Sequence, residues 1–290
     1  GFTGVLSTIP EEEKADRVTP RGRKVGNDLE KQREKLVEQY EPRFKNYYQS
    51  LKSRVNGIVG RQLERGVDTT KAMPFTASEL IPDSEIGNLS NLLFRLYTDV
   101  VKSSVGIINN SGIAGEITFD DKAPYVTKIT TQAPARASLI HQTVQKDVKK
   151  MMDIAFERGY GLDQLASGVP DEKFKGLKSL LNEAENRATM VARTETMRSQ
   201  NQSTNEVYRA QGFEYVRAFD EDGSPHDTFV PAGDPYGRTC AERNNQIYHI
   251  DDAMNIDDHP NGTLSWVPMP RNYVPSGQLS DFIIHQKETV

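Results

Sequence analysis

The spacing of apolar side chains is the feature that most restricts what this chain can fold into. Up to Gly212, large apolar residues recur at intervals of mostly three, four or seven positions over long stretches. Such intervals align side chains along one side of an α-helix, which must bury that stripe against a neighbouring element. The pattern therefore predicts a mainly α fold built from long amphipathic helices.

The first of these stripes follows residues 1–26, whose prolines, glycines and charges predict a flexible segment. A helix is expected to begin near Asn27 or Asp28, either of which can act as its N-cap. Its apolar positions are Leu29, Leu36, Tyr40, Phe44, Tyr47, Leu51, Val55 and Ile58. Pro42 predicts a bend or a split of this helix near Tyr40, because proline removes a helical hydrogen bond.

Further helices are expected over about 88–108, 135–158 and 162–167. Gly159 suits the end of the second of them, because glycine readily adopts the left-handed conformation that closes a helix. Residues 109–131 are instead rich in Gly, Thr and Asp, with β-branched runs at 116–119 and 125–129. A hairpin or an extended arm is expected there.

The last long helix is expected over about 172–211, closed by Gly212. Beyond it, short alternating and β-branched runs predict strands, and loops rich in Asp, Pro and Gly connect them. The expected strands are Phe213–Phe219, Gln246–Ile250 and Thr263–Val267. The sequence therefore predicts a small C-terminal α+β module after the helices, followed by a tail over 271–290.

Composition excludes several classes of protein. The mean hydropathy is -0.64, and no run of about 18 apolar residues exists that could span a membrane. A single cysteine, Cys240, excludes an internal disulfide framework and fits a reducing compartment such as a bacterial cytoplasm. The chain has no Gly-rich phosphate loop, no Gly-x-Ser-x-Gly elbow and no His-Glu-x-x-His helix.

Charge is distributed unevenly along the chain. Residues 14–65 contain 14 Lys and Arg against 7 Asp and Glu, whereas residues 214–258 contain 3 against 11. A basic helical arm can neutralise phosphates and an acidic module repels them, although two ordinary solvated faces would give the same pattern. The side chains expected to contact DNA or an acidic protein surface are Arg21, Arg23, Lys24, Arg54, Arg61 and Arg65.

The segment around Glu195 carries the most information. Extending the apolar stripe from Ala188 and Val191 by helical steps places Glu195 on the buried side, where a carboxylate must be paired or hydrogen-bonded. Arg198, three residues further on, or a donor from the C-terminal module is expected to supply the partner. A catalytic role would need a second acid or a base nearby, and the local sequence offers neither.

We therefore expect a polar latch between this helix and the module. Its residues are Arg193, Thr194, Glu195 and Asn201. Arg193 lies about 200° around the helix axis from Glu195, so the two side chains are expected to contact different neighbours.

The run Ala192-Arg193-Thr194-Glu195-Thr196, with a downstream Asn and the preceding segment 158–166, resembles the signature of phage head morphogenesis proteins. This family is named after the F protein of phage Mu. The resemblance covers about 135–270 and includes the order of the elements: a helix, a glycine turn, a short helix, the motif helix and a small β module. Residues 27–134 would then form a helical arm.

The resemblance implies a minor capsid protein. We expect neither enzymatic activity nor a cofactor. Such a protein is made in the cytoplasm of the bacterial host and resides in the virion, in the capsid interior or at the portal vertex. Its implied partners are the portal protein, the major capsid protein and the packaged double-stranded DNA. Its implied roles are head assembly, DNA packaging and genome ejection. The apolar stripes over 27–65 and 88–108 are expected to dock on the portal.

In many members of this family the β module carries a Thr-Cys-x-x-Cys step and a His-Pro-Asn-Cys-x-Cys step, which suggest a metal knuckle. Here Arg243 stands at the second sulfur position, and both cysteines that should follow His259 are missing. Cys240 and His259 supply two ligands, so His249 or Asp234 would have to complete the four of a structural zinc site.

A metal-free, degenerate knuckle is the expected outcome. Its residues are Asp234, Cys240, Arg243 and His259. Hydrogen bonds, packing of the single tryptophan, Trp266, and an ion pair between Arg243 and an aspartate are expected to hold it together.

Two other functions remain open at this point. One is a metal-dependent hydrolase or a transferase-type toxin, since acidic and histidine residues are abundant in the module. These are Asp220, Asp222, His226, Asp227, Asp234, Asp251, Asp252, Asp257, Asp258 and His259. They lie mostly in loops beside Gly and Pro, where Asp commonly caps turns. The other is a scaffold or adaptor that is absent from the mature virion.

Overall fold

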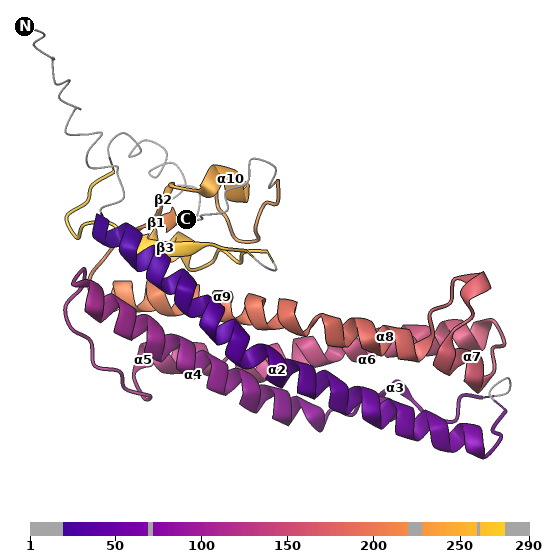
Figure 1. Cartoon of the computed structure of the whole chain (residues 1–290). Helices are drawn as coiled ribbons and strands as arrows, with labels where there is room; N and C mark the ends of the chain where they lie inside the picture. The colour runs from indigo at the N-terminus through magenta and orange to yellow at the C-terminus, as the bar shows by residue number, and fades with distance from the viewer. Residues whose placement is uncertain (1–19, 69–71, 220–227, 260–261, 276–290) are drawn as a thin grey trace, which may run out of the picture.

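One helix, α2 (Pro20–Glu64), runs along the whole length of the molecule (Figure 1). The computed structural model describes residues 20–68, 72–219, 228–259 and 262–275. At 1.5 Å per residue, the 45 residues of α2 span about 67 Å. The helix therefore reaches from the C-terminal module at one end to the opposite end of the helical body.

The start of α2 corrects the prediction of a flexible segment over 1–26. Residues 20–26 are helical, and Gly22, Val25 and Gly26 are buried. A Cβ atom on Gly26 would lie 2.7 Å from the ring of Phe219, so glycine allows the module to pack directly on this turn. Residues 1–19 lie outside the described residues.

Pro42 does not split α2, which is the second correction. Its ring faces solvent, while Tyr40 and Phe44 on either side of it are buried. The missing hydrogen bond of a proline costs stability, but packing on both sides of the helix outweighs that loss here. Of the bend or split predicted near Tyr40, the split was therefore wrong.

The helical body is completed by elements that pack mainly on α2 and on one another. They are α3 (Ala77–Leu80), α4 (Glu85–Ser111), α5 (Pro124–Thr130), α6 (Ala133–Glu157), α7 (Leu162–Ser167), a 3-10 turn (Pro170–Glu172), α8 (Gly176–Asn186) and α9 (Ala188–Ala210). Helices α2, α4 and α9 contact one another, α6 packs on α4, and α8 packs on α2. The helices expected over 88–108, 135–158 and 162–167 are confirmed.

The hairpin expected within 109–131 is wrong. Helix α4 continues to Ser111, and Tyr125–Ile129 belongs to α5, which begins at Pro124 and buries Val126 and Ile129 three residues apart. The backbone of Ile117 bonds to the side chain of Asn109, with its N–H donating over 2.9 Å and its carbonyl accepting over 2.7 Å. The side-chain amide of Asn109 thus makes the two backbone hydrogen bonds that a neighbouring strand would make with Ile117 in a hairpin.

The single helix expected over 172–211 is two helices. Helices α8 and α9 meet at Arg187, where ψ is -8° and the helix is interrupted. The interruption allows α8 to pack on α6 and α7 while α9 packs on α2, α4 and α5. Gly212, with φ of +77°, ends α9 as expected.

The C-terminal module contains a three-stranded antiparallel sheet in the order β2-β1-β3. The strands are β1 (Tyr215–Phe219), β2 (Ile247–His249) and β3 (Ser265–Pro268), with the short helices α10 (Cys240–Arg243) and α11 (Ile250–Ala253) beside them. Val216 pairs with Tyr248, and Ala218 pairs with Trp266. The fold is thus mainly α with a small α+β module, as predicted.

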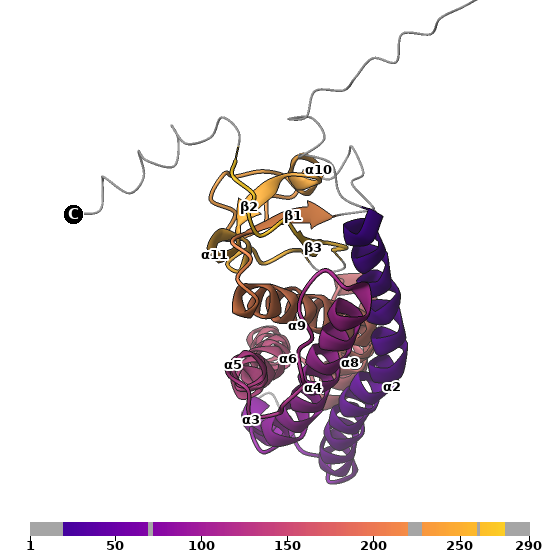
Figure 2. The same cartoon turned by 90° about the vertical axis from the view of Figure 1, so that its left-hand side faces the viewer.

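Figure 2 shows the sheet stacked above α9, with α4, α5 and α6 below it. Strand β3 contacts both α9 and α2. One continuous core joins α2 and α4 to α6, α8, α9 and the sheet, and fully buried Trp266 belongs to it. The predicted segments 27–134 and 135–270 therefore share their core.

The apolar stripes that were expected to dock on a partner are used inside this core. Leu29, Leu36 and Leu51 of α2 are at most 3% exposed, and Leu93 and Val101 of α4 are fully buried. They pack against α8 and α9 or against α6 instead of facing outward. Within the described ranges, no helix combines the length and the apolar character needed to cross a membrane.

Candidate functional site

Helix α9, which carries the sequence motif, buries an unusually polar surface. Its buried polar residues are Glu195, Thr196, Ser199, Gln200, Asn201, Ser203, Thr204, Asn205 and Glu206. Several hydroxyls bond to the helix's own carbonyls, as Thr196 does to Ala192 over 2.7 Å and Ser199 does to Glu195 over 2.7 Å. Because these side chains are short and internally satisfied, neighbouring elements can approach α9 closely.

Glu195 forms the centre of a buried charged network. Its side chain is 2% exposed and accepts hydrogen bonds from Arg136 Nη2 at 2.5 Å, from Arg136 Nε at 3.2 Å and from the Tyr97 hydroxyl at 2.5 Å. Tyr97 comes from α4 and Arg136 from α6. The burial of Glu195 is as predicted, but both expected partners, Arg198 and the module, are wrong. The network joins three helices.

Electrostatics keep Tyr97 and Arg136 in defined protonation states. Burial raises the pKa of Tyr97 far above its ordinary value, and the charge of Glu195 raises it further. Burial lowers the pKa of Arg136, but its hydrogen bonds to Glu195 and the charge of that group raise it by more. Tyr97 therefore stays a neutral donor and Arg136 a cation at any pH that the fold tolerates.

The other residues of the predicted latch lie elsewhere on α9. Arg193 is exposed and lines a hollow of about 340 Å³ together with Glu30, Glu34 and other residues of α2. Thr194 donates to the carbonyl of Met190 at 2.8 Å. Arg193 and Glu195 thus contact different neighbours, as predicted, but only Glu195 belongs to the network.

The contact between helices and module depends on Arg33, which the sequence analysis did not single out, and on Arg198, which it had expected to pair with Glu195. Arg33 of α2 is 6% exposed and donates to Gln200 at 3.0 Å, to the Leu264 carbonyl at 3.0 Å and to the Ser265 hydroxyl at 2.6 Å. Arg198 of α9 donates to Asp257 at 2.7 Å. Arg33 stands four positions after Leu29 on the apolar stripe of α2, a signal that could have revealed its burial.

The degenerate knuckle is built around a buried ion pair. Arg243 Nη2 lies 2.8 Å from Asp258 Oδ1, and both side chains are fully buried. The same nitrogen lies 3.5 Å from Cys240 Sγ, which in turn lies 3.5 Å from Asp258 Oδ1. The expected pairing of Arg243 with an aspartate is confirmed. Asp258 had not been assigned to the knuckle.

Asp234 belongs to another part of the module. Its carboxylate accepts from the Tyr248 hydroxyl at 3.1 Å and from the Tyr236 backbone N–H at 2.9 Å. His249 likewise does not join the knuckle, because its ring nitrogen accepts from the Asp251 backbone N–H at 3.3 Å. Neither of the two residues that a zinc site would have needed as further ligands therefore belongs to the knuckle.

The side chains present do not fit the metal that the family resemblance implies. Ligand atoms of Cys240, Asp258 and His259 lie within 4.8 Å of one another, as a metal site requires. However, the guanidinium of Arg243 contacts two of these three residues and is itself a cation. A zinc ion in the same place would meet a fixed positive charge and would lack a fourth ligand.

Other acidic residues of the module have separate partners. Asp257 pairs with Arg198, and Asp251 pairs with Arg209. Asp220, Asp222, His226 and Asp227 lie outside the described residues. Among the residues that are described, the acidic side chains at 251, 257 and 258 are thus distributed over three different arginines, which argues against a shared divalent ion.

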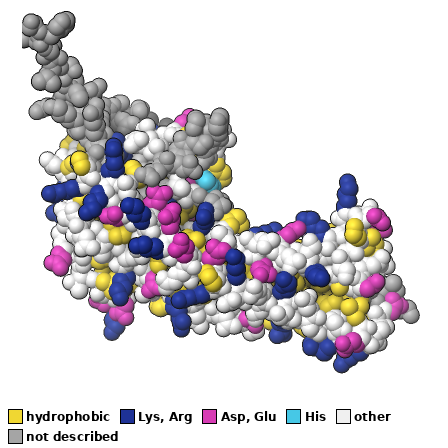
Figure 3. Space-filling model, in the orientation of Figure 1, with side chains coloured by type: hydrophobic (Ala, Val, Ile, Leu, Met, Phe, Trp, Pro, Cys, Tyr) yellow, Lys and Arg dark blue, Asp and Glu magenta, His cyan; other side chains and the backbone are white. Residues whose placement is uncertain are grey.

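The basic residues expected to contact a partner form two separate groups on α2. Arg21, Arg23 and Lys24 are exposed near its start. Arg54 and Arg61 near its end, and Arg65 just beyond it, are exposed as well. At 1.5 Å per residue, Lys24 and Arg54 are about 45 Å apart along the helix. Figure 3 shows positive and negative side chains mixed along the face between the two ends.

Comparisons with known proteins complete this description. No family model, no curated protein and no solved structure matches the chain.

Proposed function

We propose that this chain is a phage minor head protein that acts at the portal vertex in head assembly, DNA packaging or genome delivery. The observation that carries the proposal is the order of elements from α6 onward. Helix α6, the turn at Gly159, helix α7, the motif helix α9 and the β module occur in the order typical of the family that the motif resembles, with the separate helix α8 between α7 and α9.

The environment of Glu195 supports a structural role for the motif. Its carboxylate is 2% exposed and is held by Arg136 and Tyr97, so a substrate would have to displace both partners to reach it. A closed network of this kind fixes the position of α9 relative to α4 and α6. On this proposal the chain acts through its surface and not as an enzyme.

Analysis of purified virions tests the proposal. Mass spectrometry of mature particles should find this chain in a few copies, and imaging without imposed symmetry should place the length of α2 against the portal. Absence from mature particles would instead support a scaffold or adaptor. Stoichiometric zinc or manganese in the purified chain would support a metal-dependent enzyme.

The basic group at the start of α2 is our candidate for contact with packaged DNA. Arg21, Arg23 and Lys24 are exposed within two turns, and the first turn of α2 contains no acidic residue. The positive end of the helix dipole adds to their charge. The electrostatic attraction of phosphate groups should therefore be stronger here than at the other end of α2, where Glu64 lies among the basic residues.

Replacing Arg21, Arg23 and Lys24 together by alanine should weaken binding to duplex DNA and reduce the salt dependence. Each lost phosphate contact lowers the slope of log affinity against log salt by about 0.9, so a reduction of about 2–3 is expected. The matched control replaces Arg54, Arg61 and Arg65 and should leave the slope unchanged. Binding that is insensitive to salt, or absent at about 50 mM salt, would leave an acidic portal surface as the partner.

A further inference from the structure

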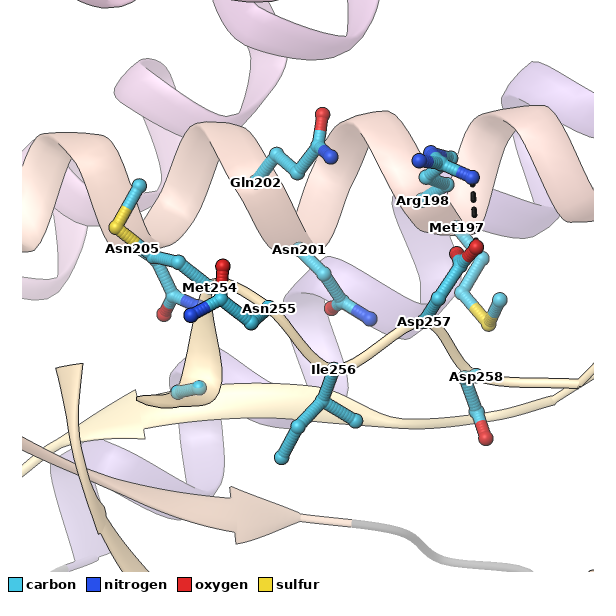
Figure 4. Close-up of a pocket in the computed structure, with 11 residues that line it drawn as sticks. Met197, Arg198, Asn201, Gln202, Asn205, Met254, Asn255, Ile256, Asp257 and Asp258 are labelled. Atoms are coloured by element: carbon cyan, nitrogen blue, oxygen red, sulfur yellow. Dashed lines mark hydrogen bonds and ion pairs between the residues drawn. The ribbon is translucent and has the colours of Figure 1, made fainter. Parts of the chain in front are cut away.

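A small polar hollow separates α9 from the segment of the module that covers it (Figure 4). It is lined by Met197, Arg198, Asn201, Gln202 and Asn205 of α9 and by residues 253–258. The positions 198, 201 and 205 follow one another at steps of three and four, so they share one face of the helix. The volume open to the centres of water molecules is about 40 Å³.

Three buried polar atoms on this face have no hydrogen-bond partner within the described chain. They are Oδ1 and Nδ2 of Asn205 and Nε of Arg198. Asn205 is fully buried, so bulk solvent cannot satisfy its carboxamide. Buried polar groups in native proteins are almost always hydrogen-bonded, to protein or to ordered water. The missing hydrogen-bond partners must therefore come from a molecule bound in the hollow.

The chemistry of the lining selects the occupant. The unpaired atoms comprise two donors and one acceptor, which suits a molecule that can both donate and accept. The charges beside them are already compensated, because Arg198 pairs with Asp257 at 2.7 Å and Asp258 pairs with Arg243 at 2.8 Å. A cation or an anion would therefore enter a site of balanced charge, without a counter-charge to hold it.

The size of the hollow also restricts which molecule can occupy it. An ordered water needs about 10–15 Å³ of such volume and two to four polar partners. The 40 Å³ available here would accommodate about three waters, and hardly any larger molecule. We propose that this hollow is a built-in hydration site whose waters bridge Asn205 and Arg198 of α9 to the 253–258 segment.

These waters would connect the module to α9 at a place where the side chains of the two parts do not pack closely against each other. Direct contacts flank the site, through the pair of Arg198 with Asp257 and through Arg33 with Ser265. A bridging water is nearly as favourable as a direct hydrogen bond. This part of the interface between α9 and the module is thus bridged by water and bordered by the Arg198–Asp257 pair.

A high-resolution crystal structure of the full chain tests the hydration site directly. We expect about three water peaks in the hollow, with at least one within hydrogen-bond distance of each Asn205 side-chain atom. Water-¹⁷O relaxation dispersion should independently count long-lived waters in solution. An empty hollow, an Asn205 side chain bonded directly to protein at both atoms, or density for an adventitious ion only would overturn the proposal.

Two variants at Asn205 provide the matched comparison. Asn205→Leu places a larger apolar side chain in the hollow and should reduce the long-lived waters there from about three to one or none. Asn205→Ala removes the same two polar atoms but leaves the space open, so the number of long-lived waters should lie between those of the wild-type chain and Asn205→Leu. An unchanged count in Asn205→Leu would contradict the proposal. If neither variant folds, the count in the wild-type chain still decides it.

Discussion

Replacing Arg243 by leucine is expected to lower the free energy of unfolding by about 3–5 kcal/mol. The change removes the arginine that pairs with Asp258 in a place where both side chains are fully buried. The carboxylate would then remain in a low-dielectric site, near the weak donor Cys240 and the Leu264 backbone N–H at 3.4 Å. Chemical denaturation monitored by the buried Trp266 in the module measures the loss.

An exposed ion pair serves as the control for this substitution. Lys149 and Asp153 lie 2.7 Å apart on α6 with side chains 66% and 53% exposed, so Lys149→Ala should change stability by no more than about 0.5 kcal/mol. The double variant Arg243→Leu, Asp258→Leu should recover part of the loss, because no unpaired charge remains. A loss below about 1 kcal/mol in Arg243→Leu would contradict the buried pair.

Arg243→Cys should convert the same place into a zinc site. The introduced thiol would join Cys240, Asp258 and His259, whose ligand atoms already lie within 4.8 Å of one another, and would complete a set of four. We expect one equivalent of zinc per chain, thiolate absorption bands with cobalt, and a fall in melting temperature on adding a chelator. If the variant binds no metal, the three wild-type side chains do not form the remnant of a knuckle.

Replacing Arg136 by methionine is the second change with a large expected effect, a loss of about 3 kcal/mol or more. Glu195 is 2% exposed, and without Arg136 its charge would depend on the Tyr97 hydroxyl as its side-chain donor. Methionine preserves much of the aliphatic volume, so most of the loss should be electrostatic. Urea denaturation of the purified chain measures it.

A double-mutant cycle separates this network from ordinary packing. Arg136→Met combined with Glu195→Leu should be more stable than Arg136→Met alone, with a coupling energy of about 1–3 kcal/mol. Lys45→Ala, which breaks a partly exposed pair with Glu41 on α2, should lie within about 0.5 kcal/mol of wild type. Strict additivity of the two core substitutions would show that Arg136 and Glu195 do not depend on each other.

Periodicity along the sequence was sufficient for the fold class but not for the boundaries of the elements. The β-branched run Tyr125–Ile129 suggested a strand, yet Val126 and Ile129 bury one face of α5. The segment 20–26 looked flexible because it lacks large apolar residues, and its helix depends on a glycine contact with Phe219, far away in the sequence. Local patterns cannot reveal such contacts.

For the candidate sites, too, the sequence predicted the features that depend on local spacing but not those that depend on distant contacts. The helical stripe predicted that Glu195 is buried, since burial depends on which face a residue occupies. Its partners, Tyr97 and Arg136, lie 98 and 59 positions away and could not be inferred from spacing. Arg243 was expected to find an aspartate, but which of the many aspartates it binds is decided by how the loop after α11 folds back on α10.

The continuity of α2 has a mechanical consequence for the whole molecule. Its first turns support the module through Gly26 and Arg33, while Lys52 is paired with Glu185 of α8 further along. A helix of about 67 Å that is attached at both ends acts as a strut. A force applied to the module would therefore be transmitted along α2 to the opposite end of the helical body. Unfolding of either end would also destabilise the helix to which both ends are attached.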